Sequence, residues 1–395
     1  MISLDEGLSR VLARARPLGD EPVGLETAYG RVLAEPLTAR GDAPRAAVSA
    51  MDGYAVLDAD LTTTPARLPV VARIFAGAAD PAPLEAGTCA RIFTGAPVPP
   101  GADRVVIQEQ VRADGDWAVF EAAPGPARHI RAAGSDFRTG DILVEPGRRL
   151  DARALVAAAA ADRDHVRVHR RPRVVILGTG DELAEPGRAL KTPGAIPESV
   201  SFGVMGLVLA WGGQVVGRRR LPDDPQALEI AARQALDDAD VVVVTGGASV
   251  GERDFAKSMF PDGALDLIFA KVAIKPGKPV WFARAGDRLV LGLPGNPTSA
   301  MVTGRLFLAP LLAGLSGRDP LEALAWREAA LGAPLKPVGD RETLERGRIQ
   351  NGRVEALSDQ DSGSQRALAA ADVLIRRRPS APAAEVGEMV SVLDF

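Results

Sequence analysis

The sequence holds a single cysteine, Cys89, among 395 residues. One thiol excludes an internal disulfide and any zinc site that needs several thiolates from one chain. Histidine is nearly as scarce, with only His129, His165 and His169. The last two lie in "HVRVH", whose alternation is typical of an exposed strand. The sequence therefore gives no support to a thiolate or histidine metal site.

A marked excess of charge is missing as well, because 47 lysines and arginines face 51 acidic residues and the net charge is −4. This balance provides no general attraction to nucleic acid or to an anionic membrane, so any anion must be bound by a local site. No apolar run approaches the roughly 20 residues that cross a bilayer. The N-terminal "MISLDEGLSRVLARARPL" predicts an amphipathic helix with a capping box at Ser3 and Glu6, not a signal peptide. We expect a cytoplasmic protein with no nucleic-acid or membrane partner.

The length, together with a hydrophobic content of 46%, predicts two to four globular domains. Short apolar runs broken by Pro and Gly between residues 20 and 150 predict β-rich modules. From residue 171, strands such as "VVVVTGG" alternate with helices such as "DPQALEIAARQALDDAD". This alternation predicts a doubly wound α/β domain whose site lies at the carboxyl ends of its strands. From about residue 321 short strands return and predict a small β-barrel.

Four loops at the ends of the predicted α/β strands carry glycines, and three of them also carry charged side chains. They are "GTGDEL" (Asp181, Glu182), "TGGASVGERDF" (Gly246, Gly247, Ser249, Gly251, Asp254), "KVAIKPGKP" (Lys271, Lys275, Lys278) and "GLPGNPTSA" (Pro294, Gly295, Asn296, Pro297, Ser299). Each loop alone could be a tight turn or a solvated surface. Together, glycines and a helix N-terminus suit a phosphate, lysines neutralise it, and carboxylates suit a divalent cation such as Mg²⁺. The lack of a G-x-x-x-x-G-K-[ST] loop argues against a P-loop nucleotidase.

The N-terminal half contributes further polar loops. "SAMDGYAV" does not read as core, because it sets Asp52 and a glycine between apolar ends. "FTGAPVPPGADRVVIQE" and "HIRAAGSDF" present Thr94, Arg131 and Asp136 on turns, several of them rich in proline. By themselves these stretches could equally be surface loops.

These motifs, in this order, resemble the molybdopterin molybdenumtransferase (MoeA) family, which includes the gephyrin E domain. The resemblance rests on "MDGYAV", "TGAPVPPGAD", "GTGDEL", "GGASVGERD", "KPGKP" and "GLPGNPTSA" and spans nearly the whole chain. It implies a homodimeric, Mg²⁺-dependent transferase that inserts molybdate into adenylylated molybdopterin and releases AMP. It also implies four domains: an elongated domain (1–45 and 140–170), a β-rich domain (46–139), an α/β molybdopterin-binding domain (171–320) and a C-terminal β-barrel (321–395).

The same resemblance implies roles for individual residues. The implied catalytic residues are Asp52, Asp136, Glu182, Asp254, Lys271 and Lys275, of which Glu182 and Asp254 would hold Mg²⁺. The implied substrate-binding residues are Thr94, Arg131, Asp181, Gly246, Gly247, Ser249, Gly251, Lys278, Pro294, Gly295, Asn296, Pro297 and Ser299, with Arg341 and Ser362 on weaker motifs. The family cleft joins the β-rich domain of one subunit to the α/β and barrel domains of the other, so Asp52 would face a partner's substrate. Contacts with the adenylyltransferase and with acceptor molybdoenzymes are implied too.

The chain departs from the family pattern at two loops. Glu198-Ser199-Val200 stands where Asp-Ser-Asn is usual, near the pterin, and Ser135-Asp136 stands where Glu-Asp is frequent. Two alternatives stay open: an adenylyltransferase acting one step earlier, and a non-enzymatic scaffold of the same fold. The additional β-modules weigh against the first, and the retained acids and lysines weigh against the second. The sequence does not separate molybdenum from tungsten as the physiological metal.

Overall fold

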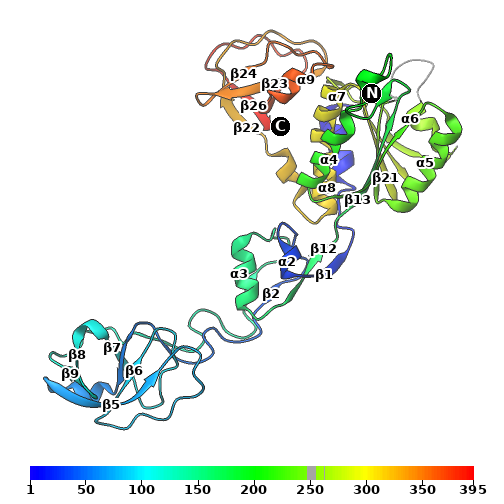
Figure 1. Ribbon diagram of the computed structural model, residues 1–395. Coiled ribbons are helices and arrows are strands. Elements are labelled where there is room, and N and C mark those ends of the chain that lie inside the picture. Colours follow the sequence, from blue (N-terminus) through cyan, green and yellow to red (C-terminus); the bar gives the residue numbers. More distant parts are fainter. Residues whose placement is uncertain (247–254, 262) are drawn as a thin grey trace.

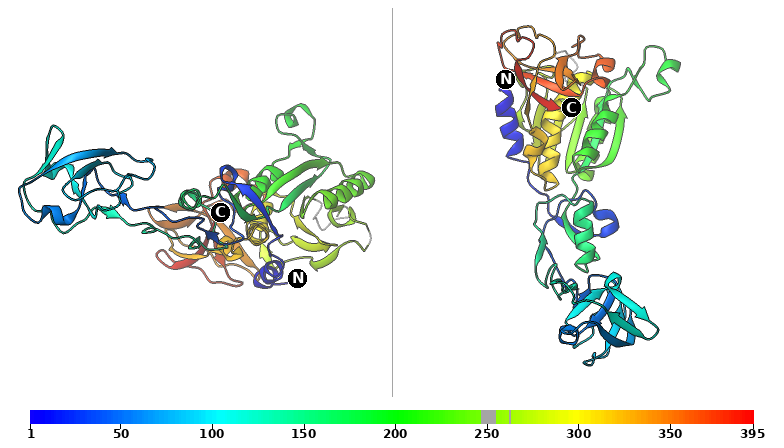
Figure 2. Two further views of the ribbon diagram at one scale, coloured as in Figure 1. Left: turned by 90° about the horizontal axis from the view of Figure 1, so that it is seen from below. Right: turned by 90° about the vertical axis from the view of Figure 1, so that its left-hand side faces the viewer.

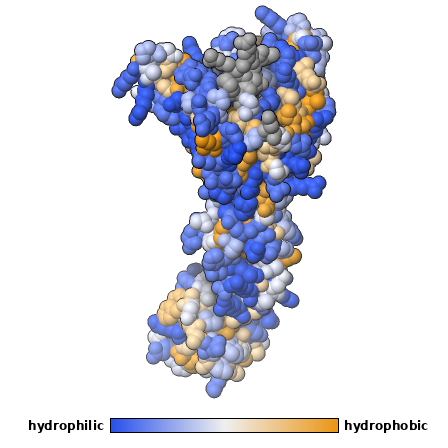
Figure 3. Space-filling model, turned by 90° about the vertical axis from the view of Figure 1, so that its right-hand side faces the viewer, coloured by the Kyte–Doolittle hydropathy of each residue, from blue (hydrophilic) through white to orange (hydrophobic). Residues whose placement is uncertain are grey.

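The computed structural model describes residues 1–246, 255–261 and 263–395. The predicted site residues Gly247, Ser249, Gly251 and Asp254 lie outside these ranges. The molecule is elongated (Figures 1 and 2), with a β-rich head at one end, a slender middle part, and a large body that contains both termini. The face drawn in Figure 3 is mainly hydrophilic along its whole length, with small apolar patches between.

The body is built around a six-stranded sheet in the order β16-β13-β17-β21-β20-β18. Its strands are β16 (Gln214–Leu221), β13 (Arg173–Thr179), β17 (Val241–Thr245), β21 (Arg288–Leu293), β20 (Trp281–Ala285) and β18 (Asp266–Phe269). The first four are parallel, and β20 and β18 run antiparallel to their neighbours. The sheet is therefore mixed at one edge.

Both faces of this sheet are covered by helices, as the doubly wound prediction requires (Figure 1). Val174 and Ile176 of β13 pack in a core with α1 (Leu4–Leu12), α4 (Val200–Ala210), α7 (Pro297–Thr303) and α8 (Ala309–Leu315). Val175 and Leu177 point the other way, into a core with α5 (Pro225–Asp238) and α6 (Phe255–Ser258). Burial of alternate residues on two faces explains the near-continuous apolar strands.

The first helix begins as predicted. The Ser3 hydroxyl accepts a hydrogen bond from the Glu6 backbone N–H at 3.1 Å, and Leu4, Leu8 and Val11 are buried. The Glu6 carboxylate pairs with Arg10 instead of returning to the cap, so only half of the capping box forms. The buried face of α1 joins the core of the body.

The expectation that no apolar run approaches a bilayer-spanning length is wrong. Within the described residues, Pro297–Leu315 is one helix of 19 residues that is long and apolar enough to cross a membrane, judged by length and composition alone. It runs through α7, a π-helical stretch at Gly304–Leu308, and α8. However, 94% of its most apolar window is buried inside the protein, so it is the central core helix of the body.

The slender middle part contains two separate two-stranded sheets. β1 (Asp20–Gly24) pairs antiparallel with β12 (His165–His169), and β2 (Leu37–Thr38) pairs with β11 (Ile142–Val144). Two short helices, α2 (Leu25–Ala28) and α3 (Ala152–Ala160), pack against them. The chain thus passes outward to the head and returns through the same part, which we call the stalk.

The head contains a six-stranded sheet in the order β7-β4-β6-β5-β9-β8. Its strands are β4 (Gly53–Val56), β5 (Ala66–Ile74), β6 (Cys89–Ile92), β7 (Arg104–Ile107), β8 (Val111–Asp114) and β9 (Trp117–Phe120), and β3 (Val48–Ser49) pairs separately with β10 (Ile130–Arg131). The prediction that "SAMDGYAV" is not core is wrong for β4, whose four residues are all buried. A Cβ on Gly53 would lie 2.1 Å from the Val106 carbonyl oxygen, so close strand packing requires this glycine.

The C-terminal part of the body is a second β-rich unit. Its sheet runs β19-β23-β25-β26-β22, with β24 paired to β23. The strands are β19 (Ile274–Lys275), β22 (Arg327–Ala330), β23 (Glu342–Gln350), β24 (Arg353–Ala356), β25 (Val373–Arg377) and β26 (Met389–Asp394), and α9 (Gln365–Ala369) lies beside them. β19 comes from the lysine-rich loop and pairs in parallel with β23. This pairing places Lys275 directly beside the C-terminal unit.

Candidate active site

Three strand ends meet at one edge of the body sheet. Thr179 ends β13, Gly246 follows β17 and Gly295 follows β21, and all three line a cavity of about 800 Å³. A Cβ on Gly246 would lie 2.5 Å from the Thr179 carbonyl oxygen, and one on Gly295 would lie 3.4 Å from the Gly246 Cα. Glycine therefore lets the strand ends close together and leaves their backbone open to the cavity. Pro294, Asn296, Pro297 and Ser299 line the same cavity, which we call the strand-end cavity.

The two acids of "GTGDEL" have different surroundings. Glu182 lines the strand-end cavity, and its carboxylate folds over Gly180, where a Cβ would lie 2.7 Å from Oε2. Asp181 does not line it; its carboxylate accepts a hydrogen bond at 3.0 Å from the backbone N–H of Asp223. Asp223 does line the cavity, so Asp181 positions a neighbouring loop. Asp223 is not among the residues predicted from the sequence, although it follows the end of β16.

Glu198, in the loop that departs from the family pattern, is a buried wall of this cavity with 2% of its surface exposed. It accepts hydrogen bonds from the Ser201 backbone N–H at 2.8 Å, from the Ser201 hydroxyl, and from Arg218 at 3.2 Å. Arg218 also pairs with Glu185 at 2.8 Å and stacks at 4.3 Å over Phe202. The carboxylate thus caps the first turn of α4, and its burial is compensated by a complete set of partners.

A second cavity of about 630 Å³ adjoins the first, and both are lined by Ser299 and Pro279. Lys275, Lys278, Arg341 and Ser362 line it, so it brings together the lysine loop and the two weaker C-terminal motifs. We call it the lysine cavity. Lys271 lines neither cavity; it is exposed, and its carbonyl accepts a hydrogen bond from the Ile2 N–H at 3.2 Å.

The lysine cavity also contains Glu345, which the sequence analysis missed. Burial raises the pKa of its carboxyl, while Arg377 and Lys275 act against that rise. Alternation along β23 could have indicated an inward side chain at this position.

The two cavities are joined by hydrogen bonds at the start of α7. The Asn296 side-chain amide donates to the Ser362 hydroxyl at 3.0 Å, and the Thr298 backbone N–H donates to the Ser362 carbonyl at 3.1 Å. β14 (Leu183–Ala184) and β15 (Ile196–Pro197) form a small ribbon at the opposite rim of the strand-end cavity. The Pro-Gly-Asn-Pro turn therefore lines the strand-end cavity and is hydrogen-bonded to Ser362 of the lysine cavity.

The remaining predicted residues lie in the head. The Asp52 carboxylate accepts hydrogen bonds from the Thr94 backbone N–H at 2.8 Å and the Thr94 hydroxyl at 2.7 Å. These bonds hold the pKa of the Asp52 carboxyl below its usual value, so it is ionised at neutral pH. Arg131 is exposed on β10, which adjoins β3. Asp136 is exposed, and its backbone N–H bonds to the Ala43 carbonyl at 3.0 Å.

The head and the two cavities lie at opposite ends of the molecule (Figures 1 and 2). One chain therefore does not bring Asp52 to its own Glu182 or Lys275. Within the described ranges, no group of three or more His, Cys, Asp or Glu residues is arranged to hold a metal ion. Of the two predicted Mg²⁺ ligands, Glu182 faces the strand-end cavity and Asp254 lies outside those ranges.

The chain is similar to known proteins over almost all of its length. Residues 2–161 match the MoeA N-terminal region (domain I and II), 175–314 a probable molybdopterin binding domain, and 328–395 the MoeA C-terminal region (domain IV). A molybdopterin molybdenumtransferase of Haemophilus influenzae is 35% identical over 369 residues, covering 92% of this chain and 91% of that protein. One of Nostoc is 36% identical over 304 residues, covering 75% and 70%.

Solved structures agree with these matches. A MoeA protein of Pyrococcus horikoshii has a TM-score of 0.86 at 27% identity and covers 100% of this chain and 99% of its own. A second structure from that organism has a TM-score of 0.81 at 26% identity, with complete coverage of both chains. The cavities at the strand ends and the similarities on either side of them lead to one conclusion: this chain belongs to the molybdopterin molybdenumtransferase (MoeA) family.

Proposed function

We propose that this protein is a transferase of molybdenum cofactor biosynthesis that inserts molybdate into adenylylated molybdopterin, with cleavage of the phosphoanhydride and release of AMP. Relatives that span most of the chain carry the name of this activity. The observation that carries the proposal is the pair of adjoining cavities: glycine turns line the first, two lysines and an arginine line the second, and each also has three acidic lining residues.

The strand-end cavity suits the phosphate-bearing substrate. Gly246 and Gly295 leave backbone groups accessible, and α7 starts at the cavity wall, where the N-terminus of a helix favours an anion. The lysine cavity suits molybdate, a tetrahedral dianion, because Lys275, Lys278 and Arg341 supply positive charge and Ser362 a hydroxyl. Because Ser299 lines both cavities, the two substrates would be held side by side.

Catalysis would consist of positioning and charge neutralisation. Lys275 and Lys278 would hold the entering oxyanion in the lysine cavity, while Glu182 and Glu198 shape the adjoining strand-end cavity. Glu182 offers Mg²⁺ the hard oxygen donors that this ion prefers, and Asp254 would complete the pair. When bound, Mg²⁺ would neutralise charge on the phosphate oxygens.

We further propose a homodimer in which each active site combines the head of one subunit with the cavities of the other. The separation of Asp52 from its own cavities supports this arrangement (Figure 1). So does α4, whose residues are apolar on every side: Phe202 and Leu209 keep 40% and 59% of their surface exposed. An apolar helix face left open to water is typical of a protein–protein contact. The cytoplasmic location and the contacts with an adenylyltransferase and acceptor molybdoenzymes remain predictions.

The direct test is to incubate the purified protein with adenylylated molybdopterin, Mg²⁺ and molybdate and to quantify AMP by chromatography. We expect AMP release that requires molybdate and consumes no ATP. Consumption of ATP in the presence of molybdopterin would favour the adenylyltransferase. Absence of AMP release from a folded protein that binds the substrate would favour the scaffold.

A further inference from the structure

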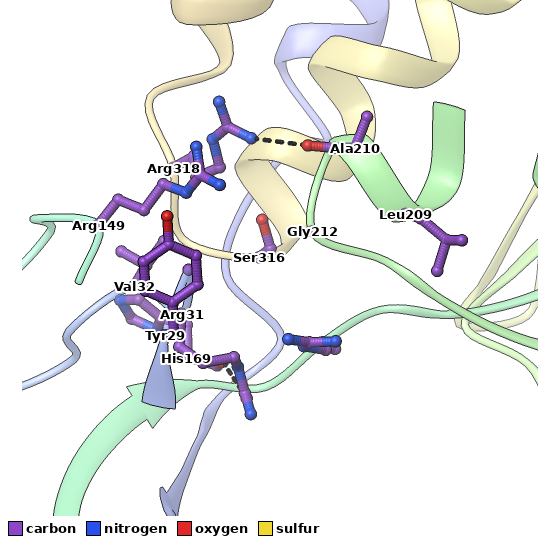
Figure 4. A pocket seen from close by; sticks show the side chains of 12 residues that line it. Tyr29, Arg31, Val32, Arg149, His169, Leu209, Ala210, Gly212, Ser316 and Arg318 are labelled. Carbon is purple, nitrogen blue, oxygen red and sulfur yellow. Dashed lines mark hydrogen bonds between the residues drawn. The ribbon is translucent and has the colours of Figure 1, made fainter. Parts of the chain in front are cut away.

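A third cavity, of about 140 Å³, lies where the stalk meets the body (Figure 4). Four of its twelve lining residues are arginines, namely Arg31, Arg149, Arg171 and Arg318, and none of the twelve is acidic. The chain as a whole is nearly balanced in charge, so this local excess needs an explanation. We call this space the hinge cavity.

The walls of the hinge cavity come from two parts of the molecule. Arg31, Arg149 and His169 belong to the stalk, whereas Ala210 is the last residue of α4 and Arg318 follows α8, both in the body (Figure 4). The parts are in close contact: a Cβ on Gly317 would lie 2.0 Å from the His169 ring. Any ligand in this cavity would touch both the stalk and the body.

Two of the arginines are held in fixed positions. Arg31 is 8% exposed and donates to the Glu21 carboxylate at 2.5 Å and to the His169 carbonyl at 2.9 Å. Arg318 donates to the Ala210 carbonyl at 3.2 Å and stacks at 4.4 Å over Trp211, and it also pairs with Glu322. Guanidinium groups fixed in this way lose little conformational entropy when they bind an anion.

The other two arginines, Arg149 and Arg171, form no ion pair in the part of the chain that the structure describes. Burial, and then the neighbouring charge of Arg31, lower the pKa of the Arg171 guanidinium, and Glu21 acts in the opposite direction. His169 Nδ1 is buried and has no hydrogen-bond partner among the described residues. Buried polar atoms of this kind are normally satisfied by a ligand or by water.

The positive surface extends beyond the cavity. An adjacent groove of about 600 Å³ shares Arg31 and Arg171 with it and adds Arg170 and Arg173, with Glu21 as its only acidic lining residue among those described. Arg170 is neutralised by Asp240 at 3.2 Å. The groove therefore gives an anion a positive path from solvent to the hinge cavity.

We propose that the hinge cavity binds a tetrahedral oxyanion of the phosphate class, and that the bound anion fastens the stalk to the body. The volume is close to that of the engineered cavity of about 150 Å³ that admits benzene, which is enough for one such anion and too small for a nucleotide. Arg149 from the stalk and Arg318 from the body would bind the same oxygen atoms, because guanidinium groups match oxyanions geometrically. The bound anion would thereby restrict the angle at which the stalk holds the head.

The test measures binding of phosphate, sulfate and chloride to the full-length protein by calorimetry at constant ionic strength. The active-site cavities could also bind phosphate, so the measurement uses Lys275→Gln/Lys278→Gln protein as its background. We expect this protein to keep one site for phosphate and sulfate. Adding Arg149→Gln and Arg171→Gln should weaken that site at least about tenfold, since charge-assisted bonds are lost. The matched control adds Arg73→Gln and Arg112→Gln, which remove the same charge from the head and should leave affinity unchanged.

A second readout tests the fastening of the stalk. The buried thiol of Cys89, whose pKa burial raises to about 12, should not react with a spin label. Labels at Ala113→Cys in the head and Asp237→Cys in the body then report the distance between them, in samples diluted with unlabelled protein. Phosphate should narrow this distance distribution unless Arg149 and Arg171 are replaced. Loss of phosphate binding in the lysine variant alone, or equal weakening by the control substitutions, would overturn the site; binding without narrowing would overturn the fastening.

Discussion

The head and the body treat their polar residues in opposite ways. In the head, Asp52 sits at the edge of a tightly packed sheet and is fixed by two hydrogen bonds from Thr94. In the body, glycines and lysines line two open cavities of about 800 and 630 Å³. The head thus presents a rigid anion, and the body presents two cavities in which lysine, arginine and acidic side chains lie together. Because the head and these cavities lie at opposite ends of one chain, we place the complete site between two subunits.

The largest effect should come from removing the positive charge of the body. Lys275→Ala/Lys278→Ala deletes two cations of the lysine cavity, each able to make charge-assisted bonds worth about 1.5–3 kcal/mol. We expect kcat/KM for molybdate-dependent AMP release to fall at least about a hundredfold. The unfolding midpoint should change little, because both side chains are exposed. Lys191→Ala, an exposed lysine that lines neither cavity, is the control and should keep near-normal turnover.

A large effect on stability is expected at the buried wall of the body. Glu198→Ala removes the buried carboxylate that pairs with Arg218 and caps α4. Breaking a buried pair costs about 3–5 kcal/mol, so urea unfolding followed by tryptophan fluorescence should show a clearly lower midpoint. Glu185→Ala breaks the more exposed pair of the same arginine and should cost about 1 kcal/mol or less. Equal losses in the two variants would mean that burial of Glu198 does not matter.

The smallest effect concerns the head. Thr94→Val keeps the backbone hydrogen bond to Asp52 but removes the one from the hydroxyl, so the pKa of Asp52 should rise toward its usual value. A depressed carboxyl pKa contributes stability above the unfolded-state pKa, and this contribution is lost as pH falls through the folded-state pKa. If turnover needs the ionised Asp52 carboxylate, the higher pKa should move the acid limb of the pH–rate profile to higher pH in Thr94→Val. An unchanged limb would show that Asp52 does not need its charge for turnover.

Much of the body could be predicted from sequence because its signals are local. The run "VVVVT" is buried on both faces as β17, and glycine turns follow it and β21. The predictions failed where distant residues decide the outcome. The helix "TSAMVTGRLFLAPLLAGL" is predicted, but Arg305 interrupts its apolar residues, and nothing nearby in the sequence shows that this guanidinium is buried against the Asp394 and Ala323 carbonyls. Burial lowers the pKa of this group to about 10.

Two other differences have the same origin. β4 is short and contains glycine and alanine, so its sequence does not announce that strands on both sides bury it. The spacing of Lys271, Lys275 and Lys278 grouped all three, but the first points away because the chain turns at β19, where it pairs with β23. Glu198 could be flagged only as a departure, because Arg218, its ion-pair partner, follows twenty residues later.

The central claim is that the head of one subunit completes the cavities of the other, and complementation tests it directly. Asp52→Ala and Lys275→Ala chains, each nearly inactive alone, are co-expressed with different tags, and AMP release is measured on the mixture. A two-fold dimer with shared sites puts both defects into one site of each mixed dimer and leaves the other intact. Random pairing makes about half the dimers mixed, so roughly a quarter of wild-type activity should return. Activity no higher than that of the parents, with mixed dimers confirmed by sequential tag purification, would contradict the claim.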